Sequence, residues 1–362
     1  MRQVPVSELV PGMITVDDIY NYNDQLVLPG GYVLNDKAII KLAFYSIPFI
    51  RIQDSREGAA PVRTSQFIQE SSYSHRIKTS PEFQIFQSTF ETTVDDFKAS
   101  INDVVEKNAP LDVDQLMKDT LSLLEKGRNS INIFDMLHNM RQYDDLTFTH
   151  CINVSLICNV FARWLGMSDE DIHLATQCGL FHDIGKLKIP EDIIKKPSRL
   201  TDYEYKIIKT HPFEGYNILK EQDLNPHVAN AALMHHERCD GFGYPLGITA
   251  EKIDPFAKMV AIADVYDAMT ATRVYRGPMC PFKVISVFES EGLQRYDARM
   301  IMTFLENVTN TYMLNHVRLS DGREGEIVMI NRLALSRPMI RSGNQYINLA
   351  DQPSTLYIEE LL

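Results

Sequence analysis

Residues 235–245 read HHERCDGFGYP, and this stretch contains more potential chemistry than an ordinary loop needs. Two adjacent imidazoles, His235 and His236, lead into a turn that contains two glycines and a proline. An acid, a base and an aromatic side chain lie among them. Glycine and proline mark turns with defined backbone shapes, so the stretch is a candidate functional site.

Length, composition and charge limit the kind of protein this chain can be. At 362 residues it is long for a single core, so two or three domains are expected. The 44% apolar and 23% charged content is typical of a soluble globular protein. A formal net charge of −12 argues against broad binding of a nucleic-acid polymer. Metals or a few arginines could still bind an anionic substrate locally.

The apolar pattern and the cysteines point to a cytoplasmic protein. No window approaches the roughly 18 consecutive apolar residues of a membrane span. The N-terminus MRQVPVSELVPGM lacks a basic start followed by an apolar run. The five cysteines show no CxxC spacing, and we expect buried free thiols.

Five segments follow from the local patterns. They are a small β-rich domain at 1–55, a polar linker at 56–81, amphipathic helices at 82–140, a run of helices at 141–310 and a small β module at 311–362. The fold class is therefore mainly α, with small β-rich modules at both ends. The helices of 82–140 need an apolar partner surface, which the following domain or a second copy of the chain could provide.

Histidines and carboxylates recur along the helical segment. They are His150, His182-Asp183, His211, His235-His236 and Asp264. A single histidine on an apolar face is usually a hydrogen-bonded core residue, but a buried carboxylate needs a partner or a metal. Adjacent ligands on a helix project about 100° apart and can serve different ions. Their joint occurrence in one bundle favours a mixed N/O multi-metal site, for Fe, Mn or Zn rather than Mg.

Four motifs, in this order and spacing, resemble the HD-GYP family, a branch of the HD phosphohydrolases. They are HDIGKLKIP, HPFEGYNIL, HHERCDGFGYP and ADVYDAMTATRVYR, and the resemblance covers about residues 140–305. It implies an HD-type helical bundle and a metal-dependent phosphodiesterase. Such enzymes open the bacterial second messenger cyclic di-GMP to linear pGpG and can continue to GMP.

The resemblance also implies roles for individual residues. The metal ligands are His150, His182, Asp183, His211, His235, His236 and Asp264, with Asp183 as the bridge between two ions. Lys186 would face a substrate phosphate or the nucleophilic hydroxide. The loop of Gly243, Tyr244 and Pro245 would line the substrate, with Tyr244 in contact with it. Arg273 and Arg276 would clamp phosphate oxygens.

Two departures from the family pattern affect these expectations. Some members have a glutamate that binds a third metal where this chain has Leu146, so we expect two divalent ions. Iron is the first expectation for the metal, with manganese or zinc as alternatives. Val274 stands where proline is common, a change expected to be mild.

Asp267, one turn after Asp264, could donate a proton or could orient a ligand histidine.

Two other functions remain open at this point. The chain could bind cyclic di-GMP without turnover and signal through its β modules, or it could hydrolyse cyclic GMP-AMP. The N-terminal domain matches no receiver, PAS or GAF signature, so its regulatory input is unknown. Residues outside the motifs are expected to be structural or solvated, namely His75, His138, His173, His227, His316 and Trp164. Asp240 could lock the turn as an Asx cap or support a ligand, and support is the favoured role.

Overall fold

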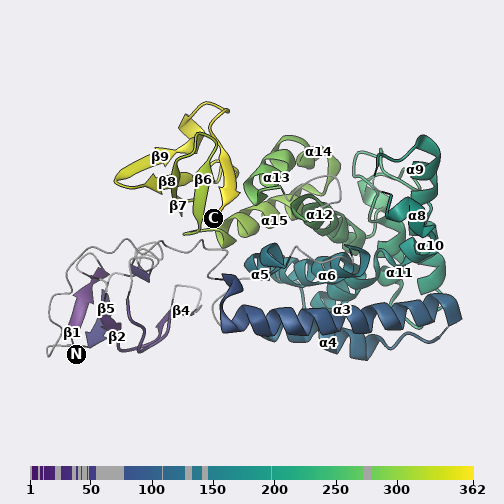
Figure 1. Ribbon diagram of the computed structural model, residues 1–362, viewed down its shortest axis with the longest axis horizontal. Helices are drawn as coiled ribbons and strands as arrows, with labels where there is room; N and C mark the ends of the chain where they lie inside the picture. Colours follow the sequence, from purple (N-terminus) through teal and green to yellow (C-terminus); the bar gives the residue numbers. More distant parts are fainter. Residues whose placement is uncertain are drawn as a thin grey trace. The chain divides into compact units, whose positions relative to one another are not determined.

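The computed structural model describes residues 2–362 apart from 7–8, 11, 21–25, 35–37, 40–41, 43–46, 48, 54–76, 108, 127–132, 141–145, 197 and 272–278. The chain divides into two compact units, Met1–Glu70 and Ser71–Leu362. The second unit is mainly helical, so the predicted fold class is confirmed (Figure 1). Among the described residues, no helix has both the length and the apolar character needed to cross a membrane.

The first unit is built from short antiparallel strands. β1 (Arg2–Pro5), β5 (Phe49–Gln53) and β2 (Ile14–Thr15) form one sheet in the order β1-β5-β2, and β3 (Ile19–Tyr20) pairs with β4 (Leu26–Leu28). Alternate residues of β5 are buried, as expected for a strand with one face on a core. Ile50 and Ile52 pack there with Leu34 and Leu42.

The second unit begins with two amphipathic helices, α3 (Pro81–Lys107) and α4 (Val113–Lys126). Phenylalanines recur at threes and fours along α3 and are buried. The ring of Phe97 lies 6.0 Å from that of Phe148 and 6.1 Å from that of Phe181, both on later helices. The following helices of the same chain therefore cover this apolar face. Pairing with a second copy through residues 82–140 stays a prediction.

The helical bundle that follows surrounds one long buried helix, α6 (Leu146–Trp164), which lies between α3 and α12 in Figure 1. Residues 150–159 of α6 are all buried, as expected for a helix that packs on all sides. The other elements are α5 (Ile133–Asn139), α7 (Asp169–Phe181), η2 (Ile184–Lys188), α8 (Glu191–Ile194), α9 (Asp202–Ile208), α10 (His211–Leu219), α11 (Pro226–Met234), η3 (Ala250–Lys252), α12 (Pro255–Thr270), α13 (Pro281–Val287), the π-helical turn η4 (Phe288–Gly292), α14 (Leu293–Arg295) and α15 (Ala298–Thr311).

Local sequence signals account for where several helices begin and end. Ser168 caps α7, and Thr201 with Glu204 forms a capping box on α9. α7 ends at Phe181, and the chain tightens into the 3-10 helix η2. His182 and Asp183 therefore lie at the end of a helix, as their expected position on or at the end of a helix allows. Asp183 has left the α conformation, with φ −103° and ψ 9°, so the two side chains diverge at a helix end.

The C-terminal residues form a five-stranded antiparallel sheet in the order β10-β6-β7-β8-β9. Its strands are β6 (His316–Leu319), β7 (Glu324–Met329), β8 (Met339–Ser342), β9 (Gln345–Asn348) and β10 (Ile358–Leu361). A hairpin turn at Asp321-Gly322 joins β6 to β7. Val317 and Ile327 belong to the same core as the helices, so the sheet packs on the helical bundle.

The cysteines and the tryptophan are placed as the sequence predicted. All five cysteines are free, and Cys151, Cys158 and Cys178 are buried. Burial raises the pKa of these three thiols, which disfavours the thiolate that would bind a metal. Trp164 stacks on Phe134, with ring centroids 5.4 Å apart.

Candidate metal centre and substrate loop

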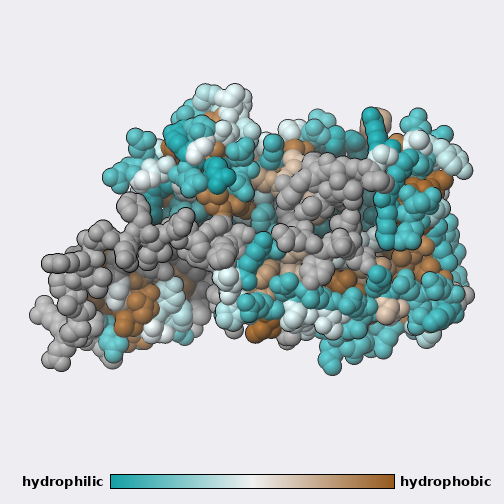
Figure 2. Space-filling model, viewed as in Figure 1, coloured by the Kyte–Doolittle hydropathy of each residue, from teal (hydrophilic) through white to brown (hydrophobic). Residues whose placement is uncertain are grey.

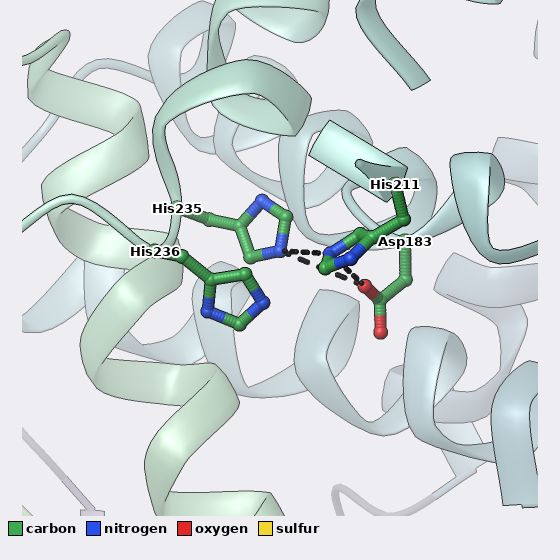
Figure 3. Close-up of side chains that lie close together, drawn as sticks. All are labelled: Asp183, His211, His235 and His236. Carbon is green, nitrogen blue, oxygen red and sulfur yellow. Dashed lines mark hydrogen bonds and ion pairs between the residues drawn. The ribbon is translucent and has the colours of Figure 1, made fainter. Parts of the chain in front are cut away.

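The structure brings the seven side chains expected to bind metal to one buried place. They are His150 on α6, His182 and Asp183 at the end of α7, His211 at the start of α10, His235 and His236 at the end of α11, and Asp264 on α12. Six are buried, and the side chain of His236 is 22% exposed. Four of the seven are drawn in Figure 3, where Asp183 and His211 face the imidazole of His235.

A glycine allows the close packing that places two of these residues together. A Cβ atom on Gly185 would lie 2.0 Å from the carbonyl oxygen of His211 and 2.4 Å from the nitrogen of Gly215. Only glycine therefore lets η2 lie directly against the start of α10. The IGK sequence after His182-Asp183 thus has a structural reason, because it holds Asp183 beside His211.

Backbone carbonyls fix the orientation of three histidines. The Nδ1 atoms of His182, His211 and His235 each donate to a carbonyl three residues earlier. The acceptors are the oxygens of Gly179, Ile208 and Ala232, at 2.7, 2.7 and 2.9 Å. A carbonyl only accepts, so Nδ1 carries the proton and, in the neutral ring, Nε2 is left with a lone pair. The Nε2 atoms of His211 and His235 lie 3.3 Å apart, an arrangement that a cation would stabilise.

Asp183 lies between two groups of these ligand atoms. Its Oδ1 lies 3.3 Å from His211 Nε2 and 3.6 Å from His235 Nε2. Its Oδ2 lies 3.3 Å from His182 Nε2 and 3.6 Å from His150 Nε2. Two sets of ligand atoms are close enough to hold an ion: Asp183 with His211, His235 and His236, and His150 with His182 and Asp264.

Two buried acceptor atoms without hydrogen-bond partners also suit this centre to the binding of metal ions. Asp183 Oδ1 and His182 Nε2 are buried and have no hydrogen-bond partner among the described residues. Buried polar atoms without partners are costly and uncommon in folded proteins. Both atoms point at the centre, so the side chains present there could bind metal ions.

The charges of the centre also suit cations. Burial alone would raise the pKa of Asp183, but Lys186 and His182 hold it well below its usual range. Burial opposes charge on His150, yet its bonds to Asp264 and Asp267 raise its pKa to about 9, so an ion bound at Nε2 would have to replace a proton. Burial lowers the pKa of His236 well below its usual value, which keeps this imidazole neutral and able to coordinate.

Asp267 is fully engaged behind the centre. Its Oδ2 lies 2.7 Å from His150 Nδ1, and its Oδ1 accepts from Asn153 Nδ2 at 3.1 Å. The opposite ring nitrogen, His150 Nε2, lies 2.9 Å from Asp264. Of the two roles expected for Asp267, these contacts favour orientation of the histidine. Asn153 was missed from the sequence because an asparagine in an apolar helix carries no specific signal.

The loop after His236 folds back over that imidazole. Tyr244 stacks on the ring of His236, with centroids 4.7 Å apart and planes at 25°. A Cβ atom on Gly243 would lie 2.4 Å from the backbone of Glu237 and of Arg238, so glycine is required for this close approach. The loop expected to line the substrate therefore forms one wall beside the centre, and Pro245 continues it.

Other predicted residues have mixed outcomes. Lys186 forms an ion pair with Asp183, and its side chain is 25% exposed. Arg273 and Arg276 lie outside the described residues, as do Val274, His75 and the side chain of Leu146. Of the two roles considered for Asp240, its contacts show the cap on the turn and not the favoured support of a ligand. It accepts from the backbone nitrogen of Phe242 at 3.1 Å and pairs with Arg238, so it stabilises the turn.

Glu237 is a further residue of this site, and sequence reasoning missed it. Its buried carboxylate accepts from the backbone nitrogens of Leu246, Gly247 and Ile248, at 2.5, 3.1 and 3.2 Å. The sequence signal that could have identified Glu237 is its position directly after the candidate ligands His235 and His236. Glu237 thus anchors the substrate loop through its main chain.

We expect Glu237→Ala to loosen this loop and to destabilise the protein by about 2 kcal/mol, because three backbone donors lose a charged acceptor. Hydrogen exchange should report the change as lost protection at Gly247 and Ile248. Glu251→Ala, which removes an exposed carboxylate from the same region, is the matched control. Equal exchange in both variants would show that Glu237 does not hold the loop.

The fold and the site together define a helical domain with a His/Asp centre able to bind metal ions. A model of the HD domain family matches residues 115–300, and the chain belongs to this family. The resemblance noted in its motifs is thereby confirmed.

Curated relatives give more detail. A cyclic di-GMP phosphodiesterase of Pseudomonas aeruginosa is 32% identical over 57% of this chain and 50% of its own length. The 3′3′-cGAMP-specific phosphodiesterase 1 of Vibrio cholerae is 36% identical over 47% of this chain and 39% of its own. The cyclic di-GMP phosphodiesterase response regulator RpfG of Xanthomonas campestris is 34% identical over 42% and 41%. The chain thus spans half or less of the length of these relatives.

Proposed function

We propose that this chain is a metal-dependent phosphodiesterase that hydrolyses cyclic di-GMP to pGpG, GMP or both, and so lowers second-messenger levels in bacterial signalling. The observation that carries the proposal is the position of Asp183, whose two oxygens face two separate groups of ligand atoms. Two relatives named as cyclic di-GMP phosphodiesterases support the choice of substrate.

The His/Asp centre would hold two divalent ions, with iron as the first expectation and manganese or zinc as alternatives. One ion would lie with His211, His235 and His236, the other with His150, His182 and Asp264, and Asp183 would join both. Bound ions of this kind polarise a phosphoryl group and lower the pKa of the attacking water. Lys186, next to Asp183, would offset negative charge that develops on the phosphate.

The remaining roles concern position. Asp267 would hold the ring of His150 in one orientation, and Gly243, Tyr244 and Pro245 would form the wall against which the dinucleotide lies. Arg273 and Arg276 are proposed to clamp phosphate oxygens, as their place in the sequence motif suggests. These side chains would thus orient the substrate and the metal ligands. In metal-assisted hydrolysis, such positioning is a large part of what the protein contributes.

A direct assay tests the proposal. The protein is purified without oxygen, loaded with Fe or Mn and incubated with cyclic di-GMP, and the products are separated by chromatography. We expect pGpG, GMP or both to form, and His182→Ala combined with Asp183→Ala to abolish their formation. Tight nucleotide binding with no product would instead identify a signalling module without turnover.

Cyclic GMP-AMP is the second candidate substrate, because one relative, 36% identical, is named as specific for it. The two dinucleotides differ in one base, while the metal centre acts on a phosphodiester that both contain. Selection between them therefore has to come from contacts with the bases. Rates measured side by side decide, and a kcat/KM for cyclic GMP-AMP that exceeds the value for cyclic di-GMP would change the substrate assignment.

A further inference from the structure

Lys209 lies between α9 and α10 and contacts two aromatic rings. Its Nζ lies 4.8 Å from the ring centroid of Tyr205 and 4.9 Å from that of Tyr244. The second ring is the one that stacks on His236. Lys209 and a candidate metal ligand therefore contact the same tyrosine, and the ammonium group lies at the margin of the centre.

The ammonium group of Lys209 has no carboxylate partner among the residues that the structure describes. In the described part of the chain, no aspartate or glutamate oxygen lies within 4 Å of it. Two lysines on neighbouring elements differ from it, because Lys186 pairs with Asp183 and Lys196 lies 2.6 Å from Glu204. Cation–π contacts hold the group in place without using up its N–H donors.

The surroundings leave this group open to a ligand. Lys209 is half-buried, and Tyr205 is 47% exposed. The surface over α8, α9 and α10 is mainly hydrophilic, with small hydrophobic groups between (Figure 2). An anion could therefore approach the ammonium from solvent while the two rings fix its position.

We propose that Lys209 binds the phosphate of the cyclic dinucleotide that is not being cleaved. This inference rests on the proposed function. A cyclic dinucleotide contains two phosphodiesters, and when one lies at the His/Asp centre the other lies away from it. That second phosphate needs a cation of its own, because Lys186 lies beside Asp183 and would serve the phosphate at the centre. Lys209 provides a fixed positive charge beside the loop that lines the substrate.

Two substrates separate this role from a structural one. Cyclic di-GMP has a second phosphate, whereas bis(4-nitrophenyl) phosphate has a single phosphodiester. For Lys209→Met we expect the ratio of kcat/KM for cyclic di-GMP to that for bis(4-nitrophenyl) phosphate to fall about tenfold, mainly through KM. Lys209→Arg should restore most of the ratio. Lys206→Met, which removes an exposed charge from α9, is the matched control and should keep the wild-type ratio.

The outcomes that overturn the inference are distinct. A ratio unchanged by Lys209→Met, or an equal loss on both substrates together with a loss of bound metal, would mean that Lys209 only supports Tyr244 and His236. If the wild-type protein cleaves bis(4-nitrophenyl) phosphate but no cyclic dinucleotide, the proposed function fails instead. The salt dependence of KM gives an independent readout, because losing a phosphate contact should reduce its slope.

Discussion

Replacing Asp183 by asparagine is expected to remove metal binding and hydrolysis together. The two oxygens of Asp183 face opposite groups of histidines, so one substitution affects both candidate metal positions. Asparagine keeps the shape of the side chain but loses its charge and presents an NH₂ group to one set of imidazoles. It also leaves the ammonium group of Lys186 without its partner. We expect cyclic di-GMP hydrolysis to fall by at least about 10³-fold.

The measurement is metal content by elemental analysis beside product formation, for wild type and Asp183→Asn prepared in parallel. Asp254→Asn is the matched control, because Asp254 is also a buried carboxylate beside a histidine, His227, at 2.6 Å. It lies outside both groups of ligand atoms. If Asp183→Asn kept the wild-type metal content and rate, Asp183 would not be the bridge.

The second large effect is expected from Asp267→Asn. The carboxylate of Asp267 accepts from His150 Nδ1, which sets the direction of His150 Nε2. Loss of such a partner typically costs 10- to 100-fold in metal affinity. We therefore expect a matching loss of activity at limiting metal, with recovery when metal is added in excess. Asn153→Ala should give a smaller loss, because Asn153 acts only through Asp267.

This experiment also separates the two roles considered for Asp267. If Asp267 donated a proton to the leaving group, excess metal would not restore kcat, and the pH profile of kcat would lose its basic limb. If it orients His150, metal titration shifts the apparent dissociation constant and kcat recovers. The contacts of Asp267 favour the second result, since both of its oxygens already have partners.

The sequence was sufficient to predict the helical bundle and which residues meet at its centre. Ligand types recur in motifs at helix ends, and the packing of those helices brings His150 and Asp264 together although 114 residues separate them. The starts of α7 and α9 can also be predicted from the capping residues Ser168 and Thr201, because the effect of a cap on the backbone is local.

Other features depended on tertiary packing and could not be read from the sequence. The break in the helix after His182 follows from the contact of Gly185 with α10, which no local pattern encodes. The apolar face of α3 fits either a second copy or its own chain, and only the structure shows that the chain covers it. Glu237 and Lys209 act through backbone groups and rings brought near by folding, so their sequence neighbours gave no specific signal.

The most direct test is the number of metal ions per chain, measured on the same anaerobic preparation that is assayed with cyclic di-GMP. The proposed function needs two ions, which Asp183 and the two groups of ligand atoms would hold, and Leu146 gives the reason to expect no third. We predict two ions per chain together with formation of pGpG or GMP. One ion or none in folded, metal-supplied protein, or full occupancy without any product, would contradict the account.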